Sequence, residues 1–166
     1  DVIWEIQEAG QALLAEEGFA QYEISAYARS ELYCQHNLNY WQFGDYLGIG
    51  AGAHSKLTRE DSREIERYSR PRHPKQYQQS PTDLVEQRWL DKADRVLEYM
   101  MNVLRLNAGF RLSHFEKITG LQRAFLLGSL KQAEQKKLLV QDGDQVQPTE
   151  KGRTYHNDLL ALFLPR

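Results

Sequence analysis

The chain has 166 residues, 41% hydrophobic and 27% charged, which is the composition of a globular protein and not of a disordered one. Lys and Arg total 21 against 23 Asp and Glu, so the net charge of −2 gives no overall positive field to attract nucleic acid or acidic lipid. The first residues lack the pattern of a signal peptide, no apolar run approaches the roughly 20 residues of a membrane span, and we expect a cytoplasmic protein. Cys34 is the only cysteine, which excludes an internal disulfide and any iron–sulfur cluster held by this chain alone.

The N-terminal segment combines a helix pattern with a strand pattern. Apolar residues recur at helical spacing over residues 2–17, and Gly18 follows as a C-terminal cap. Residues 22–25 have strand composition, so the two elements are half of a βα repeat, whose sheet needs parallel neighbours. Those neighbours are missing and the first residue is Asp1, so we expect a fragment or processed piece whose preceding sheet lies upstream.

Residues 36–41 are the first candidate for a ligand site. In a helical turn His36 and Tyr40 lie four residues apart, as do Asn37 and Trp41, so the four side chains share a face. An imidazole can bind a haem iron, and aromatic rings can lie against a macrocycle. The alternative is ordinary packing of Tyr40 and Trp41 beside a surface histidine.

Residues 46–57 alternate glycine with apolar residues and are expected to form one strand. Period-two geometry would put Gly48, Gly50, Gly52 and His54 on one face and Ile49 on the other. A face of bare backbone indicates close approach of a ligand or another chain segment, and the alternative is close packing inside a barrel. The glycines do not form a dinucleotide fingerprint, because no apolar helix follows them.

Residues 58–82 are charged and proline-rich, and we expect a linker there with a short strand near Tyr68. Ser80 and Pro81 are typical of a helix start, and an apolar stripe from Val85 to Val103 predicts one long helix after them.

The remaining sequence predicts two short helices at 112–119 and 122–137, a hairpin turning on Asp142-Gly143, and a last helix from Thr149 to about Leu164. This is the outline of a winged-helix-like domain. Its basic residues are few and scattered, so a docking or structural role is favoured over binding of nucleic acid.

Three segments carry a specific resemblance: residues 23–29 (EISAYAR), 34–41 (CQHNLNYW) and 44–55 (GDYLGIGAGAHS). They closely resemble the HemW family of radical S-adenosylmethionine haem chaperones, which is related to the oxygen-independent coproporphyrinogen III oxidase HemN. The similarity runs nearly end to end. The HNLNYW segment is the discriminating part, because the oxidases have a different motif there.

The resemblance assigns residues to two parts of a site. It implies that His36, Asn37, Tyr40 and Trp41 belong to a haem-binding signature. It also implies that a barrel strand lines the cofactor cavity, with Gly48, Ile49, Gly50, Gly52 and His54 as the residues concerned.

The resemblance further implies an α/β fold: residues 1–57 as the end of a partial (β/α) radical S-adenosylmethionine barrel, 58–82 as a linker or excursion, and 83–166 as a mostly helical, winged-helix-like HemN-type C-terminal domain. The family's CxxxCxxC motif, which holds a four-iron four-sulfur cluster with S-adenosylmethionine, has no counterpart here. We therefore expect the cluster to be bound outside this chain in the parent protein, and this chain alone to be inactive as an enzyme.

The leading interpretation is part of a haem chaperone that binds haem and passes it to an apo-haemoprotein acceptor, with weak membrane association only through that acceptor. A second interpretation is an oxygen-independent coproporphyrinogen III oxidase of porphyrin biosynthesis. A third is a winged-helix module that binds nucleic acid, although no nucleic-acid partner is expected.

Overall fold

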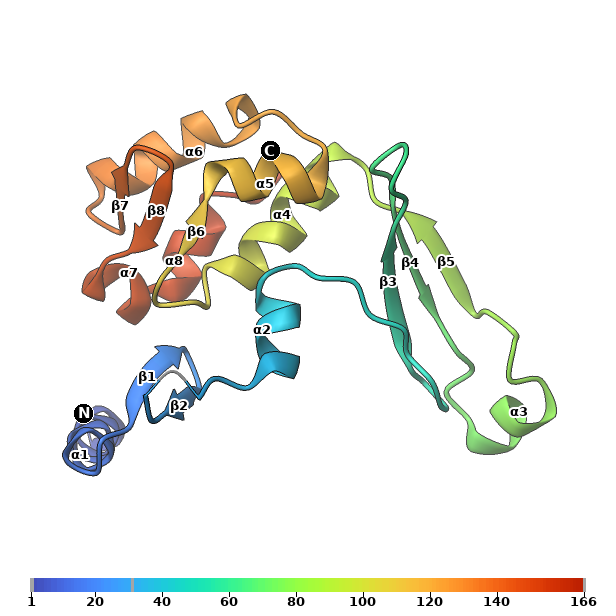
Figure 1. Cartoon of the computed structure of the whole chain (residues 1–166), viewed down its shortest axis with the longest axis horizontal. Coiled ribbons are helices and arrows are strands. Elements are labelled where there is room, and N and C mark those ends of the chain that lie inside the picture. The colour runs from blue at the N-terminus through green and yellow to red at the C-terminus, as the bar shows by residue number, and fades with distance from the viewer. Residues whose placement is uncertain (1, 31, 166) are drawn as a thin grey trace.

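The computed structural model describes residues 2–30 and 32–165 (Figure 1). The helices in chain order are α1 (Val2–Glu16), α2 (Gln35–Trp41), α3 (Pro74–Gln79), α4 (Lys92–Val103), α5 (Leu112–Thr119), α6 (Ala124–Gln135), α7 (Glu150–Thr154) and α8 (His156–Ala161). The strands are β1 (Ala20–Glu23), β2 (Ala26–Ala28), β3 (His54–Thr58), β4 (Ile65–Ser69), β5 (Glu86–Trp89), β6 (Phe110–Arg111), β7 (Leu139–Asp142) and β8 (Gln145–Pro148).

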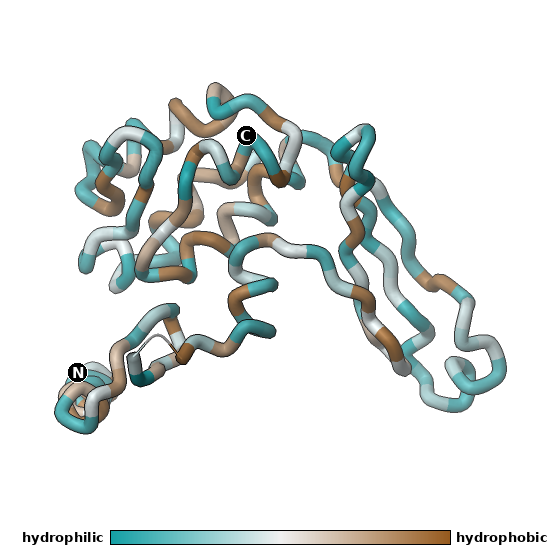
Figure 2. The backbone as a smooth tube through the Cα atoms, viewed as in Figure 1, coloured by the Kyte–Doolittle hydropathy of each residue, from teal (hydrophilic) through white to brown (hydrophobic). Residues whose placement is uncertain are grey.

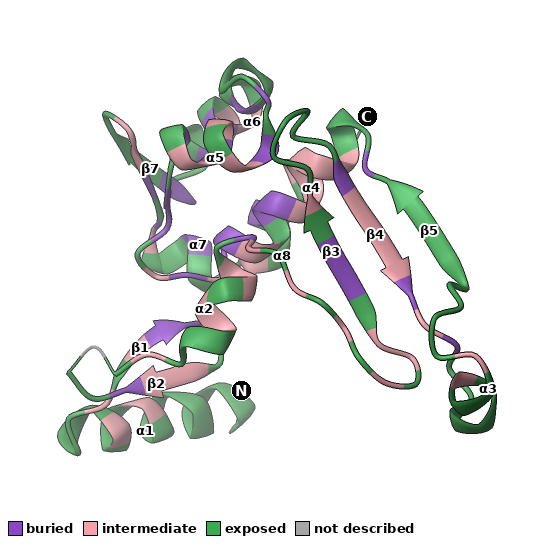
Figure 3. Cartoon of the chain, turned by 45° about the vertical axis from the view of Figure 1, so that its right-hand side comes forward, coloured by how far each residue is buried: buried purple, intermediate pink, exposed green. Residues whose placement is uncertain are grey.

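The N-terminal helix is confirmed, and its end is the expected glycine cap. Gly18 has a left-handed φ of 78°, and the amide of Phe19 donates to the carbonyl of Leu14 at 2.9 Å. None of the residues of α1 is buried, and Figure 3 shows a mostly exposed helix with a few patches of intermediate burial. The apolar stripe that predicted the helix is therefore largely open to solvent, with Leu14 partly buried.

The strand expected at residues 22–25 begins and ends earlier and is not part of a parallel sheet. β1 pairs antiparallel with β2, with Ala20 opposite Ala28, and Ile24 and Ser25 form the turn between them. Every strand pairing within residues 2–30 and 32–165 is antiparallel. The short connection explains the difference, because two residues can join antiparallel strands but cannot cross over to a parallel one.

The single strand expected over residues 46–57 is wrong. Tyr46 pairs with Lys56 in an isolated antiparallel bridge, and the chain reverses between them. Gly50 and Gly52 have φ of 117° and 71°, and the amide of Ala53 donates to the carbonyl of Gly50 at 3.2 Å, which closes a turn. These glycines were expected to form the bare face of one strand. They allow the chain to reverse instead. The connecting loop is largely apolar (Figure 2).

The segment after this turn is a three-stranded antiparallel sheet in the order β3-β4-β5. The short strand expected near Tyr68 is confirmed as β4, and α3 lies at the far end of the sheet in Figure 1. The long helix expected after Ser80 is wrong at its start, because Glu86–Trp89 is β5 and the helix begins only at Lys92. Asp91 caps it by accepting from the Asp94 amide at 2.8 Å.

The C-terminal part has the predicted winged-helix-like order of elements. α4 is followed by β6, by the helices α5 and α6, and by the hairpin β7–β8, and the sheet order is β6-β8-β7. Gly120 ends α5 with a φ of 70°, and Gly143 turns the hairpin with a φ of 56°. The last predicted helix is interrupted at Tyr155, which separates α7 from α8.

The hydrophobic core lies mainly among the C-terminal elements, around Tyr99, Phe110 and Phe115. Phe43, which follows α2, joins the same core, and its ring meets that of Tyr99 edge-on at 5.7 Å between centroids. The segment that carries α2 is thus packed against the C-terminal part. Within residues 2–30 and 32–165, no helix is both long and apolar enough to span a membrane.

Candidate functional site

The helix α2 carries the residues 36–41, as the sequence predicted. It is short, and the chain after it is bent sharply at Phe43, whose φ of 60° is left-handed. The side-chain amide of Asn39 donates to the carbonyl of Asp45 at 2.9 Å, and a Cβ on Gly44 would lie 2.2 Å from the Asn39 side-chain oxygen. This close turn fixes where α2 ends relative to the strand pair after it.

Three rings form a continuous row beside α2, which we call the aromatic ladder: His36, Tyr40 and Tyr46. The His36 and Tyr40 rings meet edge-on at 4.9 Å between centroids. The rings of Tyr40 and Tyr46 are tilted by 58° at 4.6 Å. His36 is exposed, and both tyrosines are half-buried. The predicted pairing of His36 with Tyr40 is therefore present, and the ladder extends it to a residue to which the sequence analysis gave no role.

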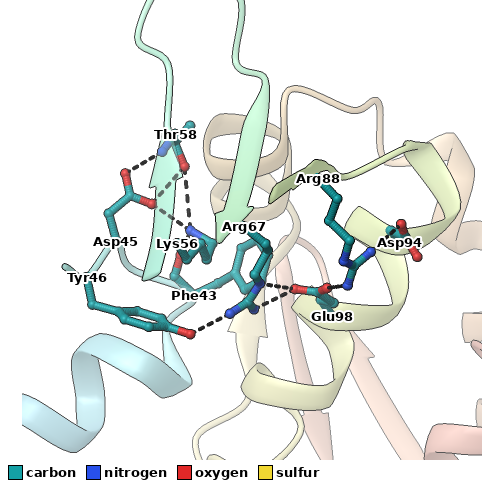
Figure 4. Close-up of polar contacts among 9 residues, drawn as sticks. All are labelled: Phe43, Asp45, Tyr46, Lys56, Thr58, Arg67, Arg88, Asp94 and Glu98. Carbon is teal, nitrogen blue, oxygen red and sulfur yellow. Dashed lines mark hydrogen bonds and ion pairs between the residues drawn. The ribbon is translucent and has the colours of Figure 1, made fainter. Parts of the chain in front are cut away.

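Tyr46 is anchored to the sheet and, through it, to α4. Its backbone exchanges two hydrogen bonds of 3.0 Å with Lys56. Its hydroxyl accepts a hydrogen bond from Arg67, which also donates to Glu98 at 2.7 Å (Figure 4). Glu98 accepts a second arginine, Arg88, at 2.8 Å. This polar network runs from the aromatic ladder to the first helix of the C-terminal part.

A buried lysine holds the bend after α2. The Lys56 ammonium group donates to the Phe43 carbonyl at 2.9 Å and to Asp45 at 2.7 Å, and it lies 4.2 Å from the centre of the Phe43 ring (Figure 4). Burial lowers the pKa of Lys56. Burial alone would raise the pKa of Asp45, but hydrogen bonds from Lys56 and Thr58 outweigh it and hold that pKa below its ordinary value.

Trp41 contacts a different neighbour from Tyr40. The guanidinium of Arg105 lies 4.1 Å from the centre of the Trp41 ring. Arg105 is itself held by Glu23, which accepts from it at 3.1 Å and is almost fully buried. The indole nitrogen of Trp41 and Nε of Arg105 are buried without a hydrogen-bond partner among the described residues. Trp41 therefore packs on Arg105, which in turn binds Glu23 of β1 and Ser25 of the β1–β2 turn.

The remaining predicted site residues do not form one surface. Gly48 packs so tightly that a Cβ there would lie 2.1 Å from the His54 carbonyl oxygen. Ile49 is 82% exposed, and the Gly50 amide donates to the Tyr77 hydroxyl at 3.1 Å. Gly48 thus serves the close approach of another chain segment, as one interpretation expected, whereas Gly50 and Gly52 allow the reversal through their positive φ. Their expected place on a single strand face is wrong.

Three of the predicted site residues have other surroundings. The Gly52 amide donates to the carbonyl of Pro71 at 2.8 Å. His54 is exposed at the start of β3 and lines a polar cavity of about 250 Å³ with Arg67, Arg88 and Glu98. Asn37 is half-buried on α2.

Four residues near α2 were not predicted as site residues from the sequence: Tyr46, Lys56, Arg67 and Arg105. Tyr46 lies within the family-like GDYLGIG segment, which was a usable signal. The other three are ordinary charged residues in sequence, and only the fold brings them to α2.

The donor set does not fit an iron–sulfur cluster, which needs several thiolates, because Cys34 is the single cysteine. Among the described residues no group of three or more His, Cys, Asp or Glu side chains could hold a metal ion.

Comparison with known proteins was made over the whole chain. A family model described as the HemN C-terminal domain matches residues 90–155. The heme chaperone HemW of Haemophilus influenzae is 44% identical over 164 residues, covering 99% of this chain and 42% of that protein. HemW of Escherichia coli is 43% identical over 164 residues, covering 99% of this chain and 43% of that protein.

A solved structure has a similar fold. Coproporphyrinogen III oxidase (HemN) from Escherichia coli, described as a radical SAM enzyme, superposes with a TM-score of 0.66 over 96% of this chain and 40% of that chain. At 18% identity this likeness is one of fold.

Together these findings define the class: a HemN-related chain of mixed helix and sheet that carries a HemN C-terminal domain. More particularly, the chain is a homologue of the HemW haem chaperones over 99% of its length. It spans about two-fifths of the length of those relatives.

Proposed function

We propose that this chain supplies the haem-contacting signature of a haem chaperone, with His36 as the iron ligand. The observation that carries the proposal is the exposed imidazole of His36, which makes no hydrogen bond with the described residues and meets the Tyr40 ring at 82° and 4.9 Å between centroids. A neutral imidazole is a common ligand of haem iron, and an aromatic ring beside it offers packing for the macrocycle.

The proposal also extends to the activity of the whole protein. Relatives at 44% and 43% identity are named heme chaperones, which supports haem and an apo-haemoprotein acceptor as partners. The cytoplasm is the location that we propose for this activity. Membrane association would come only through the acceptor. A four-iron four-sulfur cluster and S-adenosylmethionine would be bound by a part of the protein that supplies the thiolates, since this chain has one cysteine.

We also propose the division into residues 1–57 as the end of a barrel, 58–82 as an excursion and 83–166 as the C-terminal domain. The match of residues 90–155 to the HemN C-terminal model supports a C-terminal domain within residues 83–166. The middle segment is more ordered than a linker, because it contains β4 and α3.

Haem titration tests the ligand. Haem is added to the chain and, in parallel, to full-length HemW of Escherichia coli, and the Soret band gives affinity and ligation state. His36→Ala, and the matching change in the relative, should shift the Soret maximum and weaken binding. His73→Ala is the matched control, because His73 is also exposed but precedes α3 at the far end of the sheet. An unchanged spectrum and affinity in His36→Ala would rule out the ligand role.

The oxidase interpretation rests on the likeness to HemN, which is one of fold at 18% identity. The chaperone is therefore the better-supported function. Product analysis separates the two: conversion of coproporphyrinogen III to protoporphyrinogen IX by the reconstituted full-length protein would favour the oxidase.

A further inference from the structure

Tyr46 continues the surface that begins at His36. Its ring meets Tyr40 at 4.6 Å between centroids, and Tyr40 meets His36 at 4.9 Å. Both tyrosines are half-buried, so part of each residue stays accessible to solvent. A flat ligand that reaches the imidazole from the Tyr40 side would therefore meet Tyr46 next.

Trp41 is less suited to that contact. One face of its indole is covered by the Arg105 guanidinium at 4.1 Å, and its ring nitrogen is buried. Its cationic neighbour Arg105 follows α4 and binds Glu23 of β1, whereas Tyr40 contacts Tyr46. The two aromatic residues of the signature thus serve different contacts.

Tyr46 is also held in place before any ligand arrives. Two backbone hydrogen bonds of 3.0 Å join it to Lys56, and its hydroxyl accepts from Arg67. Arg67 cannot swing freely, because Glu98 accepts from its Nε at 2.7 Å. A ring fixed in this way loses little conformational freedom on binding, which favours affinity.

The residues beyond Tyr46 add apolar surface. Leu47 is 60% exposed and Ile49 is 82% exposed, and both follow Tyr46 closely in the loop before β3. Exposed apolar side chains beside a fixed aromatic ring are the kind of surface that an apolar macrocycle covers.

We propose that Tyr46 is a haem-contacting residue that packs against the macrocycle together with Tyr40. Trp41 instead anchors α2, through Arg105, to the β1–β2 turn. This inference rests on the proposed function, namely that the chain binds haem through His36.

Substitution of Tyr46 tests the proposal by haem titration of the whole chain. Tyr46→Leu removes the ring and should weaken haem binding by about 2- to 10-fold, the range that an aromatic contact contributes. Tyr46→Phe keeps the ring and loses only the bond from Arg67, so its affinity should stay within about twofold of the original. In both variants the Soret maximum should be unchanged, because His36 still binds the iron.

Tyr68→Leu is the matched control. Tyr68 is a half-buried tyrosine of the same sheet, and its ring also lies under an arginine, Arg70, at 5.4 Å. Tyr68 has no ring contact with Tyr40, so the Tyr68→Leu variant should bind haem with unchanged affinity. Equal affinity of Tyr46→Leu, Tyr68→Leu and the original chain would overturn the inference while leaving haem binding intact. Absence of any Soret shift in the original chain would overturn the proposed function instead.

A second measurement needs no substitution, so it tests the contact even if the Tyr46→Leu variant fails to fold. Tyrosines of the original chain are nitrated with tetranitromethane, with and without saturating haem, and the sites are quantified by peptide mass spectrometry. Haem should protect Tyr46 and leave the exposed Tyr155 equally reactive. Equal nitration of Tyr46 with and without haem would contradict the proposed contact.

Discussion

The ammonium nitrogen of Lys56 lies 2.7 Å from Oδ1 of Asp45, and this ion pair ties the bend after α2 to β3. The lysine side chain is 1% exposed and the aspartate 39%. A charge buried to that degree is stable only while its partners remain, so the bend and the strand are expected to form together.

Replacing Lys56 with methionine should destabilise the protein by about 3 kcal/mol, the lower end of the cost of breaking a buried ion pair, because Asp45 can still reach water. The Phe43 carbonyl would also lose its donor. Chemical unfolding in urea measures the change in the free energy of unfolding. Lys75→Met, at an exposed position on α3, is the control, and equal stability of the two variants would show that the pair contributes little.

Substitutions of Arg105 and Glu23 should have strongly coupled effects on the free energy of unfolding. The Glu23 side chain is 1% exposed, so Arg105→Met leaves a buried carboxylate without its cation and should cost about 3 to 5 kcal/mol. Adding Glu23→Gln to that variant removes the unpaired charge and should recover part of the loss. A double-mutant cycle by urea unfolding tests this. Strictly additive effects would contradict a direct ion pair.

Gly48 is expected to tolerate no side chain. A Cβ there would lie 2.1 Å from the backbone oxygen of His54, so Gly48→Ala must push two paired segments apart. We expect a loss of about 1 to 3 kcal/mol, typical of overpacking. Gly128→Ala is the control, because a Cβ on α6 meets nothing within 4 Å, and it should stabilise the helix by about 0.5 to 1 kcal/mol. Thermal unfolding of the two variants gives the comparison.

The carboxyl of Glu116 gives a pH dependence of stability. Hydrogen bonds from the side chain and backbone of Arg123 lower its pKa from about 4.5 to about 2. A group whose pKa is depressed in the folded state stabilises the fold above its unfolded pKa, and that stabilisation is lost as the pH falls from about 4.5 to about 2.

The Glu116→Gln variant removes this titration. Its free energy of unfolding should fall less steeply between pH 4.5 and pH 2 than that of the original chain, which acid titration followed by circular dichroism can measure. Glu134→Gln, at an exposed position near the end of α6, is the control. Identical slopes for the original chain and Glu116→Gln would mean that the Arg123 contact does not persist in solution.

Elements with strong local signals could be predicted from the sequence. Gly18, Gly120 and the Asp142-Gly143 turn mark helix ends and a hairpin because glycine adopts left-handed φ at little cost. The pairing of His36 with Tyr40 followed from helical spacing alone.

One strand, β5, and one contact of the site could not be predicted, because distant pairing decides both. The apolar residues of positions 85–89 continue the helical spacing of α4, yet Glu86–Trp89 pairs with β4, where Trp89 lies opposite Glu66. Strand propensity depends on the neighbours that a segment meets, and these were not visible in the sequence. Likewise, the approach of Arg67 to Tyr46 depends on the sheet that β4 joins.

Glu98 is the shared counter-ion of Arg67 and Arg88. Its loss would leave two neighbouring guanidinium groups, of which Arg88 keeps the ion pair with Asp94 while Arg67 loses its carboxylate, a cost that a single compensating substitution would not remove. These positions are therefore expected to be inherited as a set during divergence of the family. A natural sequence with a neutral residue at position 98 should also have lost at least one of the two arginines.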